Sequence, residues 1–322
     1  MIVLQDVSKK FGTQTAVDNI SFEAYDKETL VLLGTSGCGK TTIFKMINRL
    51  LEPDSGQILI NGKNIKDQKP EALRRTIGFV MQHGGLFPHY TVAKNIAVQP
   101  DLLNWDQKHI FKRTAELLEK LNLPQNILTR YPHELSGGQQ QRIGIARALI
   151  ANTPVLLMDE PFGALDTITK AAIHSEFKSL DELTNKTTIL VTHDISEAFD
   201  LGHRICLLDK GRIIQMGTPQ QMLYRPADDF ARNFFFFFTF HIPSHKIITQ
   251  TLIDYHLYVF FPHFFISIAT QSLAVKSYNL NFFPHKHITH SHIQKFVFLP
   301  YCFFFILLFF TVDMCLYILA CV

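Results

Sequence analysis

A glycine-rich stretch that ends in lysine and threonine carries the clearest chemical signal of the sequence. It matches the pattern G-x-x-x-x-G-K-[ST], in which glycines let the backbone wrap phosphate oxygens and turn its N–H groups inward. Lys40 is expected to reach the β and γ phosphates of a nucleotide, and the Thr41 hydroxyl to hold Mg²⁺. Nucleotide contacts are expected from the whole stretch, which comprises Gly34, Thr35, Ser36, Gly37, Cys38, Gly39, Lys40, Thr41 and Thr42.

Two acidic residues, Asp159 and Glu160, follow a short apolar run. Asp159 suits the organisation of Mg²⁺ through water, and Glu160 suits a general base that polarises an attacking water. An acidic pair after a strand is, taken alone, more often a solvated turn, but the phosphate-binding stretch upstream favours the catalytic interpretation. A further apolar run ends just before His193, where we expect a contact to a γ-phosphate; a histidine on its own is usually structural.

These residues each follow an apolar segment that reads as a buried strand. The segments 29–33, 155–158 and 188–191 are short, apolar and rich in branched side chains, which is typical of strands buried on both faces. A helix is expected to start near Thr41, so that its positive dipole end faces the phosphates. The sequence therefore predicts an α/β fold with a mainly parallel sheet around the phosphate-binding loop.

The octapeptide Leu-Ser-Gly-Gly-Gln-Gln-Gln-Arg at residues 135–142 precedes an apolar helical run at 143–150. Ser136 is expected to cap this helix, and the small residues after it leave the first amide groups of the helix accessible. Such a helix start is an anion site, and in a head-to-tail pair of chains it can face the γ-phosphate held by the partner.

With these motifs in this order, the chain resembles the nucleotide-binding subunit of an ABC transporter from Met1 to about Asp229. The resemblance implies that Phe11 stacks on adenine, although an ordinary core phenylalanine is the alternative there. It implies that Gln82 contacts Mg²⁺ and relays the nucleotide state to membrane subunits. Catalytic roles are implied for Glu160, His193 and Gln82, and metal binding for Thr41, Gln82 and Asp159.

The same resemblance implies a functional homodimer with two ATP molecules sandwiched between its protomers. Ser136, Gly137, Gly138 and Gln139 would contact the nucleotide of the opposite protomer, and Ala164, Leu165 and Asp166 would form a loop that crosses the interface. It further implies an antiparallel N-terminal sheet and a helical subdomain at about residues 88–150. The expected ligands are ATP and Mg²⁺.

Four more particular stretches, at residues 45–50, 86–89, 130–134 and 159–166, are similar to importers of quaternary-amine osmoprotectants such as glycine betaine, carnitine or choline. The implied partners are transmembrane permease subunits and, through them, a substrate-binding protein, with no nucleic acid. The implied location is the cytoplasmic face of the inner (plasma) membrane, as a peripheral subunit. An importer of another small solute such as an amino acid is the alternative.

Two other classes are compatible with a nucleotide-binding domain of this type. ABC ATPases of DNA repair insert a long coiled coil before the signature helix, whereas only about 95 residues separate Lys40 from Ser136 and show no sustained heptads. Translation factors of this type carry two cassettes on one chain, and this chain shows one. A truncated product that binds ATP without assembling is the remaining alternative.

Composition and charge indicate the partners and the cellular compartment of the protein. The net charge of +3, from 31 basic and 28 acidic residues, gives no large field to attract nucleic acid. Five cysteines are odd in number and lack the spacing of metal ligands, which favours a reducing compartment. The first residues lack the basic and apolar regions of a secretory signal, so we expect the N-terminal part to stay inside the cell.

Composition changes abruptly after Asn233, so the predicted domains are residues 1–233 and 234–322. All 16 glycines precede this point, whereas the 89 residues after it hold 19 of the 29 phenylalanines and only two acids. We interpret the tail as a frameshifted or misassigned coding end without a stable core. The alternative is a real membrane segment at residues 296–312, which are uncharged and mostly apolar.

Overall fold

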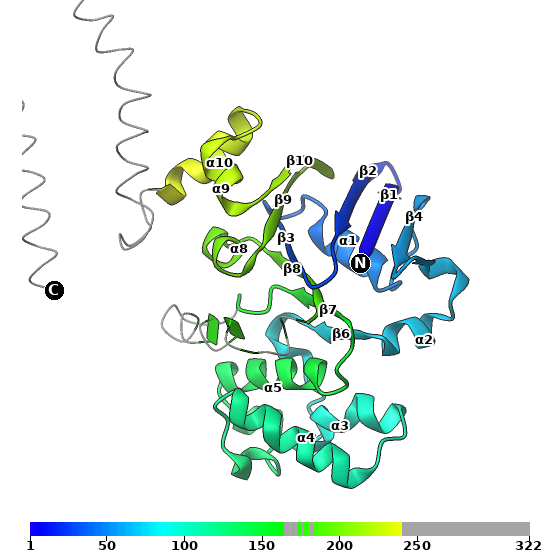
Figure 1. Ribbon diagram of the computed structural model, residues 1–322, viewed down its shortest axis with the longest axis vertical. Coiled ribbons are helices and arrows are strands. Elements are labelled where there is room, and N and C mark those ends of the chain that lie inside the picture. Colours follow the sequence, from blue (N-terminus) through cyan, green and yellow to red (C-terminus); the bar gives the residue numbers. More distant parts are fainter. Residues whose placement is uncertain are drawn as a thin grey trace, which may run out of the picture. The chain divides into compact units, whose positions relative to one another are not determined.

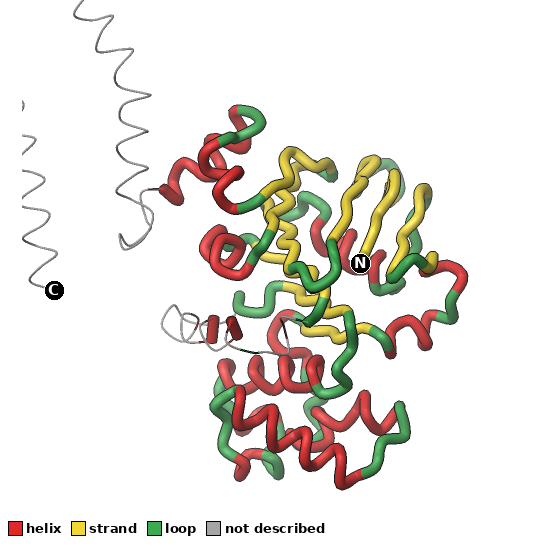
Figure 2. The backbone as a smooth tube through the Cα atoms, in the orientation of Figure 1, coloured by secondary structure: helices red, strands yellow, loops and turns green. Residues whose placement is uncertain are grey.

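The computed structural model describes residues 1–163, 170, 173–174, 177–178, 180, 183 and 185–239 of the 322-residue chain. The chain divides into two units, residues 1–242 and 243–322, and the described residues all belong to the first. Figure 1 traces their helices and strands along the sequence, and Figure 2 separates helical from sheet regions by colour. The hydrophobic segment predicted at 296–312 lies outside the described residues.

An antiparallel sheet is formed by the first strands of the chain. It consists of β1 (Ile2–Phe11), β2 (Gln14–Ala24), β4 (Ser55–Ile60) and β5 (Lys63–Asn64), in the order β2-β1-β4-β5. Along β2, Ile20, Phe22 and Ala24 are buried while the residues between them are exposed, as expected for a strand with one solvated face. The antiparallel N-terminal sheet is therefore confirmed.

A second, mainly parallel sheet carries the predicted chemistry. Its strands are β10 (Arg212–Gly217), β9 (Arg204–Asp209), β3 (Thr29–Gly34), β8 (Thr187–Thr192), β7 (Val155–Asp159) and β6 (Ile77–Val80), in that spatial order. All neighbouring pairs are parallel except β9 and β10. Strand β3 leads through the glycine-rich loop into α1 (Lys40–Ile47), which is the predicted strand–loop–helix order.

Each face of the parallel sheet packs against its own hydrophobic core. Leu30 and Leu32 of β3 belong to a cluster that includes residues of β1, β2 and α1, whereas Val31 and Leu33 belong to one with residues of α3, α5 and α8. Successive residues of a strand point to opposite faces, so an unbroken apolar run serves both cores. This arrangement explains why β3 has no polar alternation.

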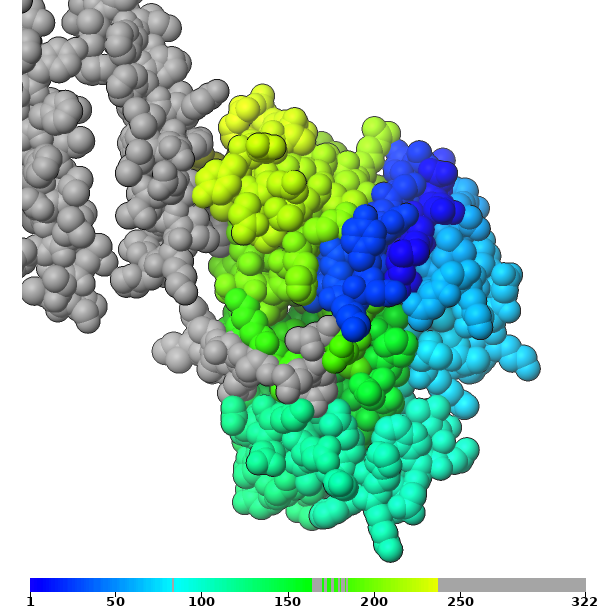
Figure 3. Space-filling model, in the orientation of Figure 1, coloured from blue at the N-terminus to red at the C-terminus, as the bar shows by residue number. Residues whose placement is uncertain are grey.

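The predicted helical subdomain is present and consists of three main helices joined by short 3₁₀ turns. The helices are α3 (Val92–Leu102), α4 (Gln107–Lys120) and α5 (Gly137–Leu149); the turns are η2 (Gln82–Gly85), η3 (Gln125–Ile127) and η4 (Pro132–Glu134). Helix α5 packs against α3, α4 and β6. In Figure 3 the turquoise surface of α3 and α4 lies away from the blue surface of β1 and β2.

The remaining described elements complete the first unit. They are η1 (Ile65–Asp67), α2 (Pro70–Arg75), α8 (Ile195–Leu201), α9 (Pro219–Tyr224) and α10 (Asp229–Thr239). Among the described residues, no helix combines the length and apolarity that a membrane crossing requires.

Helix α10 runs across the predicted domain boundary at residue 233. Phe235 is only 2% exposed, and its ring centre lies 5.7 Å from that of Phe199 in α8. The first unit extends to residue 242, beyond the change in composition. The boundary at residue 233 was inferred from composition alone and stays a prediction.

We expect Phe235→Ala to lower the free energy of unfolding by about 3–5 kcal/mol, because the change leaves a cavity between α10 and α8. Phe236→Ala is the matched control: this neighbouring ring is 39% exposed, and its loss is expected to cost about 1 kcal/mol or less. Urea denaturation of the full chain measures both. Equal costs for the two variants would contradict the packing of α10.

Candidate nucleotide site

The glycine-rich loop leaves β3 at its carboxyl end and passes close to neighbouring backbone. A Cβ atom on Gly34 would lie 2.2 Å from the Leu208 carbonyl oxygen, and one on Gly39, where φ is 108°, would lie 2.6 Å from the Ala16 carbonyl oxygen. Only glycine fits at such close approaches. Thr35, Ser36 and Gly37 at the loop's centre are exposed, so the part expected to meet phosphates is accessible.

Lys40 is buried and its ammonium group lies inside the loop. Its Nζ donates hydrogen bonds to the carbonyl oxygens of Gly34 at 2.7 Å and Thr35 at 2.8 Å. The Cys38 sulfur, which is also buried, lies 3.7 Å from the same Nζ. A buried cation needs such polar partners, and two carbonyl dipoles supply them here.

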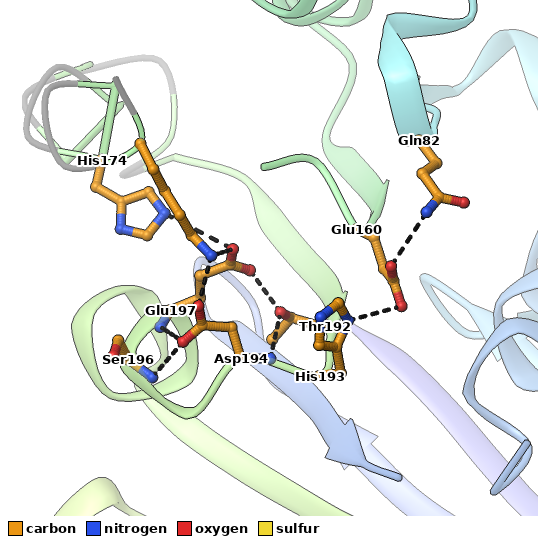
Figure 4. Close-up of polar contacts among 9 residues, drawn as sticks. Gln82, Glu160, His174, Thr192, His193, Asp194, Ser196 and Glu197 are labelled. Carbon is orange, nitrogen blue, oxygen red and sulfur yellow. Dashed lines mark hydrogen bonds and ion pairs between the residues drawn. The ribbon is translucent and has the colours of Figure 1, made fainter. Parts of the chain in front are cut away.

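Three predicted catalytic side chains meet at the carboxyl ends of β6, β7 and β8. The Gln82 Nε2 donates a hydrogen bond to the Glu160 Oε2 at 3.2 Å, and the His193 Nδ1 lies 3.2 Å from the Glu160 Oε1. Figure 4 shows the Glu160 carboxylate between the other two side chains. The sequence predicted a role for each residue but did not predict that one carboxylate would be shared in this way.

The backbone of Glu160 adopts a left-handed conformation that is uncommon for residues with a side chain. Its φ is 43°. Its N–H donates to the Val191 carbonyl at 2.9 Å, and its own carbonyl accepts from the Gly163 N–H at 3.2 Å. Such strain costs on the order of 1–3 kcal/mol and persists only where surrounding contacts hold it.

Asp159, the last residue of β7, is the acidic group expected to organise Mg²⁺. Burial and the adjacent Glu160 charge raise the pKa of the Asp159 carboxyl, while Lys45 and Lys40 oppose that rise. A nearby divalent cation favours the charged carboxylate. Together with the Thr41 hydroxyl, the donors are oxygen atoms of the kind that Mg²⁺ prefers, so the residues present fit this ion.

Ser136 caps α5, as predicted from the octapeptide. Its Oγ accepts a hydrogen bond from the Gln139 N–H at 3.3 Å, and the Gln139 Oε1 accepts one from the Ser136 N–H at 3.1 Å. This reciprocal capping box fixes the helix start. A Cβ atom on Gly137 would meet nothing within 4 Å, so the amides of the first turn are approachable.

Phe11 lies at the end of β1 and is 51% exposed, so the core alternative for this residue does not hold. The Lys9 Nζ lies 5.8 Å from the centre of its ring. The exposed ring face is available for stacking. Its predicted contact with adenine remains a prediction.

The predicted interface loop of Ala164, Leu165 and Asp166 lies outside the described residues. Their expected place at the dimer interface, and the expected part of Asp166 in nucleotide binding, therefore stay predictions. The turn before them is described, and it begins at Pro161 directly after Glu160.

Sequence reasoning missed Arg147, which joins α5 to the turn that carries Gln82. Its Nη1 and Nη2 donate to the carbonyl oxygens of Gly85 and Gly84, each at 2.9 Å. The planar guanidinium suits this forked contact. A single cation within the apolar helical run at 143–150 was the available signal, since a charge on a buried helix face needs a specific partner.

A second missed group lies beneath His193 and consists of Lys170, Thr192, Asp194 and Glu197. The Lys170 Nζ lies 2.5 Å from oxygens of both Asp194 and Glu197. The sequence did show Asp194 at a helix start with Glu197 three positions later. Nothing local indicated Lys170, because it lies more than twenty residues away along the chain.

Comparison with known proteins places the chain among ATP-binding cassettes. The family model described as ABC transporter matches residues 17–163. The chain is 50% identical over 235 residues to the choline transport ATP-binding protein OpuBA of Bacillus subtilis, covering 73% of this chain and 62% of that protein. It is equally 50% identical over 235 residues to the glycine betaine uptake system ATP-binding protein YehX of Escherichia coli, covering 73% and 76%.

A solved structure shows the same fold. The dimeric post-hydrolysis state of the ATP-binding cassette MJ0796, bound to ADP and Pi, is 34% identical, with a TM-score of 0.62, and the match covers 68% of this chain and 99% of that one. The fold and the glycine-rich loop together define a P-loop domain of the ABC type. With relatives half identical to it, the chain belongs to the ABC transporter family.

We expect Lys40→Ala to weaken nucleotide binding at least tenfold, because each charge-assisted phosphate contact is worth roughly 1.5–3 kcal/mol. Lys66→Ala, an exposed lysine in η1, is the control and is expected to bind as the unaltered chain does. Titration with a fluorescent ATP analogue measures both affinities. An unchanged affinity of Lys40→Ala would remove the loop from its predicted role.

Proposed function

We propose that this chain binds and hydrolyses Mg-ATP as the motor subunit of an importer for quaternary-amine osmoprotectants. The observation that carries the proposal is the Glu160 carboxylate, held between Gln82 and His193 at the ends of neighbouring strands. The matched region spans 62% of the length of the choline relative, so the activity, cargo and partners of the whole protein are all part of this proposal.

ATP binding begins with the glycine-rich loop. The exposed residues 35–37 and the amino-terminal end of α1 offer N–H groups to the phosphates. Lys40 exchanges the carbonyl oxygens of Gly34 and Thr35 for phosphate oxygens, which gives its charge a stronger partner. Mg²⁺, held through Thr41 and Asp159, would neutralise phosphate charge. Phe11 supplies an aromatic face to the adenine.

Hydrolysis uses Glu160 as the general base. A water placed beside its carboxylate gives a proton to the Glu160 oxygen as the water oxygen bonds to the γ-phosphorus, and the bond from that phosphorus to the bridging oxygen breaks to leave ADP and phosphate. His193 and Gln82 orient the carboxylate through their 3.2 Å contacts. His193 is also expected to contact the γ-phosphate.

The site is completed by a second copy of the chain. The capped start of α5 presents accessible amides, and in a head-to-tail pair these face the phosphates held by the partner's loop. The likeness to a dimeric cassette with bound ADP and Pi supports this arrangement. Asp166 is proposed to take part at the same interface.

The cargo and the membrane partners are inferred from relatives. The names of two half-identical relatives specify choline transport and glycine betaine uptake, which supports a quaternary-amine cargo. Transmembrane permease subunits would use the hydrolysis, a substrate-binding protein would act through them, and the chain would sit at the cytoplasmic face of the membrane.

An uptake assay tests the cargo. Cells that lack other importers and express the chain with its permease are expected to take up radiolabelled glycine betaine and choline, but not an amino acid.

We expect Glu160→Gln to slow ATP turnover by about 10²-fold or more while ATP still binds, because the amide keeps the shape of the carboxylate but cannot accept the proton. Hydrolysis then fails after the two chains have closed on ATP. The variant should therefore accumulate as an ATP-dependent dimer. Phosphate release and gel filtration with and without Mg-ATP measure the two effects.

The control for this experiment is Glu119→Gln, an exposed carboxylate in α4, which should match the unaltered chain in both assays. Wild-type turnover by Glu160→Gln, with a monomer peak under both conditions, would remove Glu160 from its role and weaken the dimer mechanism. A full chain that binds ATP but neither dimerises nor turns it over would favour the truncated, non-assembling product.

A further inference from the structure

The residues on both sides of His193 are tied to one buried carboxylate. The Asp194 N–H donates to the Thr192 Oγ1 at 3.0 Å, and the Thr192 hydroxyl donates to the Glu197 Oε2 at 2.5 Å. Asp194 also caps α8 by accepting from the Ser196 and Glu197 N–H groups. The Glu197 side chain is 1% exposed, so these contacts fix the turn from the inside.

The same carboxylate is paired with a lysine from a distant part of the chain. The Lys170 Nζ lies 2.5 Å from the Glu197 Oε1 and 2.5 Å from the Asp194 Oδ2. Burial lowers the pKa of Lys170, but its hydrogen bonds to Asp194 and Glu197 outweigh this effect and leave the pKa raised. Burial also raises the pKa of Glu197, against the contacts from Lys170 and Thr192.

A buried pair of this kind contributes little net stability, yet breaking it is costly because a charge is left without a partner. The arrangement therefore specifies a geometry more than it adds free energy. The turn from Thr192 to Asp194 directs the His193 ring to Glu160 (Figure 4), with 3.2 Å between the His193 Nδ1 and the Glu160 Oε1. The His193 side chain is itself 57% exposed, so its own packing gives it little support.

The same cluster also packs against the turn that carries Glu160. His174 lies beside Glu197, with 4.0 Å between its Nε2 and the Glu197 Oε1. Its ring meets the buried Phe162 ring edge-on, at 4.6 Å between centres. Phe162 follows Glu160 by two residues in the chain, so the cluster packs under both the histidine turn and the glutamate turn.

We propose that Lys170 and Glu197 are positioning residues, which hold the turn of β8 into α8 so that His193 stays in contact with Glu160. This inference rests on the proposed function for its catalytic consequence. Neither residue is among those expected to contact the nucleotide. Their part is to tie the histidine turn to the segment that follows residues 164–166, the stretch predicted to cross the dimer interface.

The first test compares turnover by the full chain and its variants. Glu197→Gln and Lys170→Met are expected to lower kcat about 10- to 100-fold, the scale of a catalytic group displaced by an ångström, with KM for ATP within twofold. Lys170→Arg, which keeps the charge and can still span both carboxylates, should recover most of the loss. A raised KM for ATP with an unchanged kcat would overturn the proposal.

The matched control is Lys178→Met. The Lys178 Nζ lies 3.3 Å from the Asp200 Oδ1 and links the same two parts of the chain, but both side chains are about half exposed. Exposed pairs contribute little, so turnover is expected to stay within twofold of the unaltered chain. A loss as large as that of Lys170→Met would mean that any link between these segments suffices, and would overturn the specific assignment.

A double-variant cycle separates positioning from a general structural effect. If Glu197 acts through His193, then adding Glu197→Gln to His193→Ala lowers kcat no further, whereas independent effects multiply. Thermal unfolding of each variant accompanies the cycle. Multiplicative losses, or losses that follow the unfolding temperature alone, would contradict the proposal.

NMR spectroscopy tests the positioning of His193 without ATP hydrolysis. The NMR signals of the His193 ring, identified by their absence from the spectrum of His193→Gln, should shift in Glu197→Gln and Lys170→Met and stay in place in Lys178→Met. If the unaltered chain shows no ATPase activity, the proposed function fails, and these signals still test the positioning. Unmoved His193 signals in both cluster variants would refute it.

Discussion

The parallel alignment of β3, β8 and β7 is the constraint on which the rest of the site depends. Leu33 pairs with Thr192 and Asp159 pairs with Val191, so the three strands end at the same level. The glycine-rich loop, the glutamate turn and the histidine turn each start within a residue or two of those ends. A slip of one residue would move a turn by about 3.3 Å and reverse the side chains, which exceeds what a hydrogen bond tolerates. Alternate side chains of these strands pack into two separate cores, so a slip would have to repack both cores at once.

At the end of β7 this alignment is turned into a local strain. The left-handed φ of Glu160 costs on the order of 1–3 kcal/mol. Backbone hydrogen bonds to the Val191 carbonyl and from the Gly163 N–H, each worth about 0.5–1.5 kcal/mol, offset part of it. The result is a carboxylate that leaves the strand sharply and meets Gln82 and His193. A residue in ordinary extended conformation would continue the strand direction, so the strain and the convergence have one cause.

The elements that the sequence predicted are those specified locally. Buried strands follow from apolar runs, the loop from its glycines, and the cap at Ser136 from a hydroxyl before small residues. The contacts it missed depend on partners far along the chain: Lys170 pairs with Glu197 more than twenty positions away, and Phe235 is buried because α10 docks on α8. Phe11 shows the limit in another way, since residue type alone left an ordinary core ring as the alternative to the expected stacking ring, and the surrounding fold decides.

The contact between α5 and η2 links the two ends of the proposed mechanism. The forked hydrogen bonds of Arg147 hold the carbonyl oxygens of Gly84 and Gly85, and a Cβ atom on Gly144 would lie 3.0 Å from Gly84, so the two backbones touch. Elements packed this closely shift together, since there is no free space between them to absorb a displacement. Helix α5 starts at the capped Ser136, and η2 starts at Gln82. In the proposed dimer, a movement that carries the helix start toward a partner's phosphate would therefore also move Gln82 relative to Glu160, which would couple dimer closure to the geometry of the proposed base.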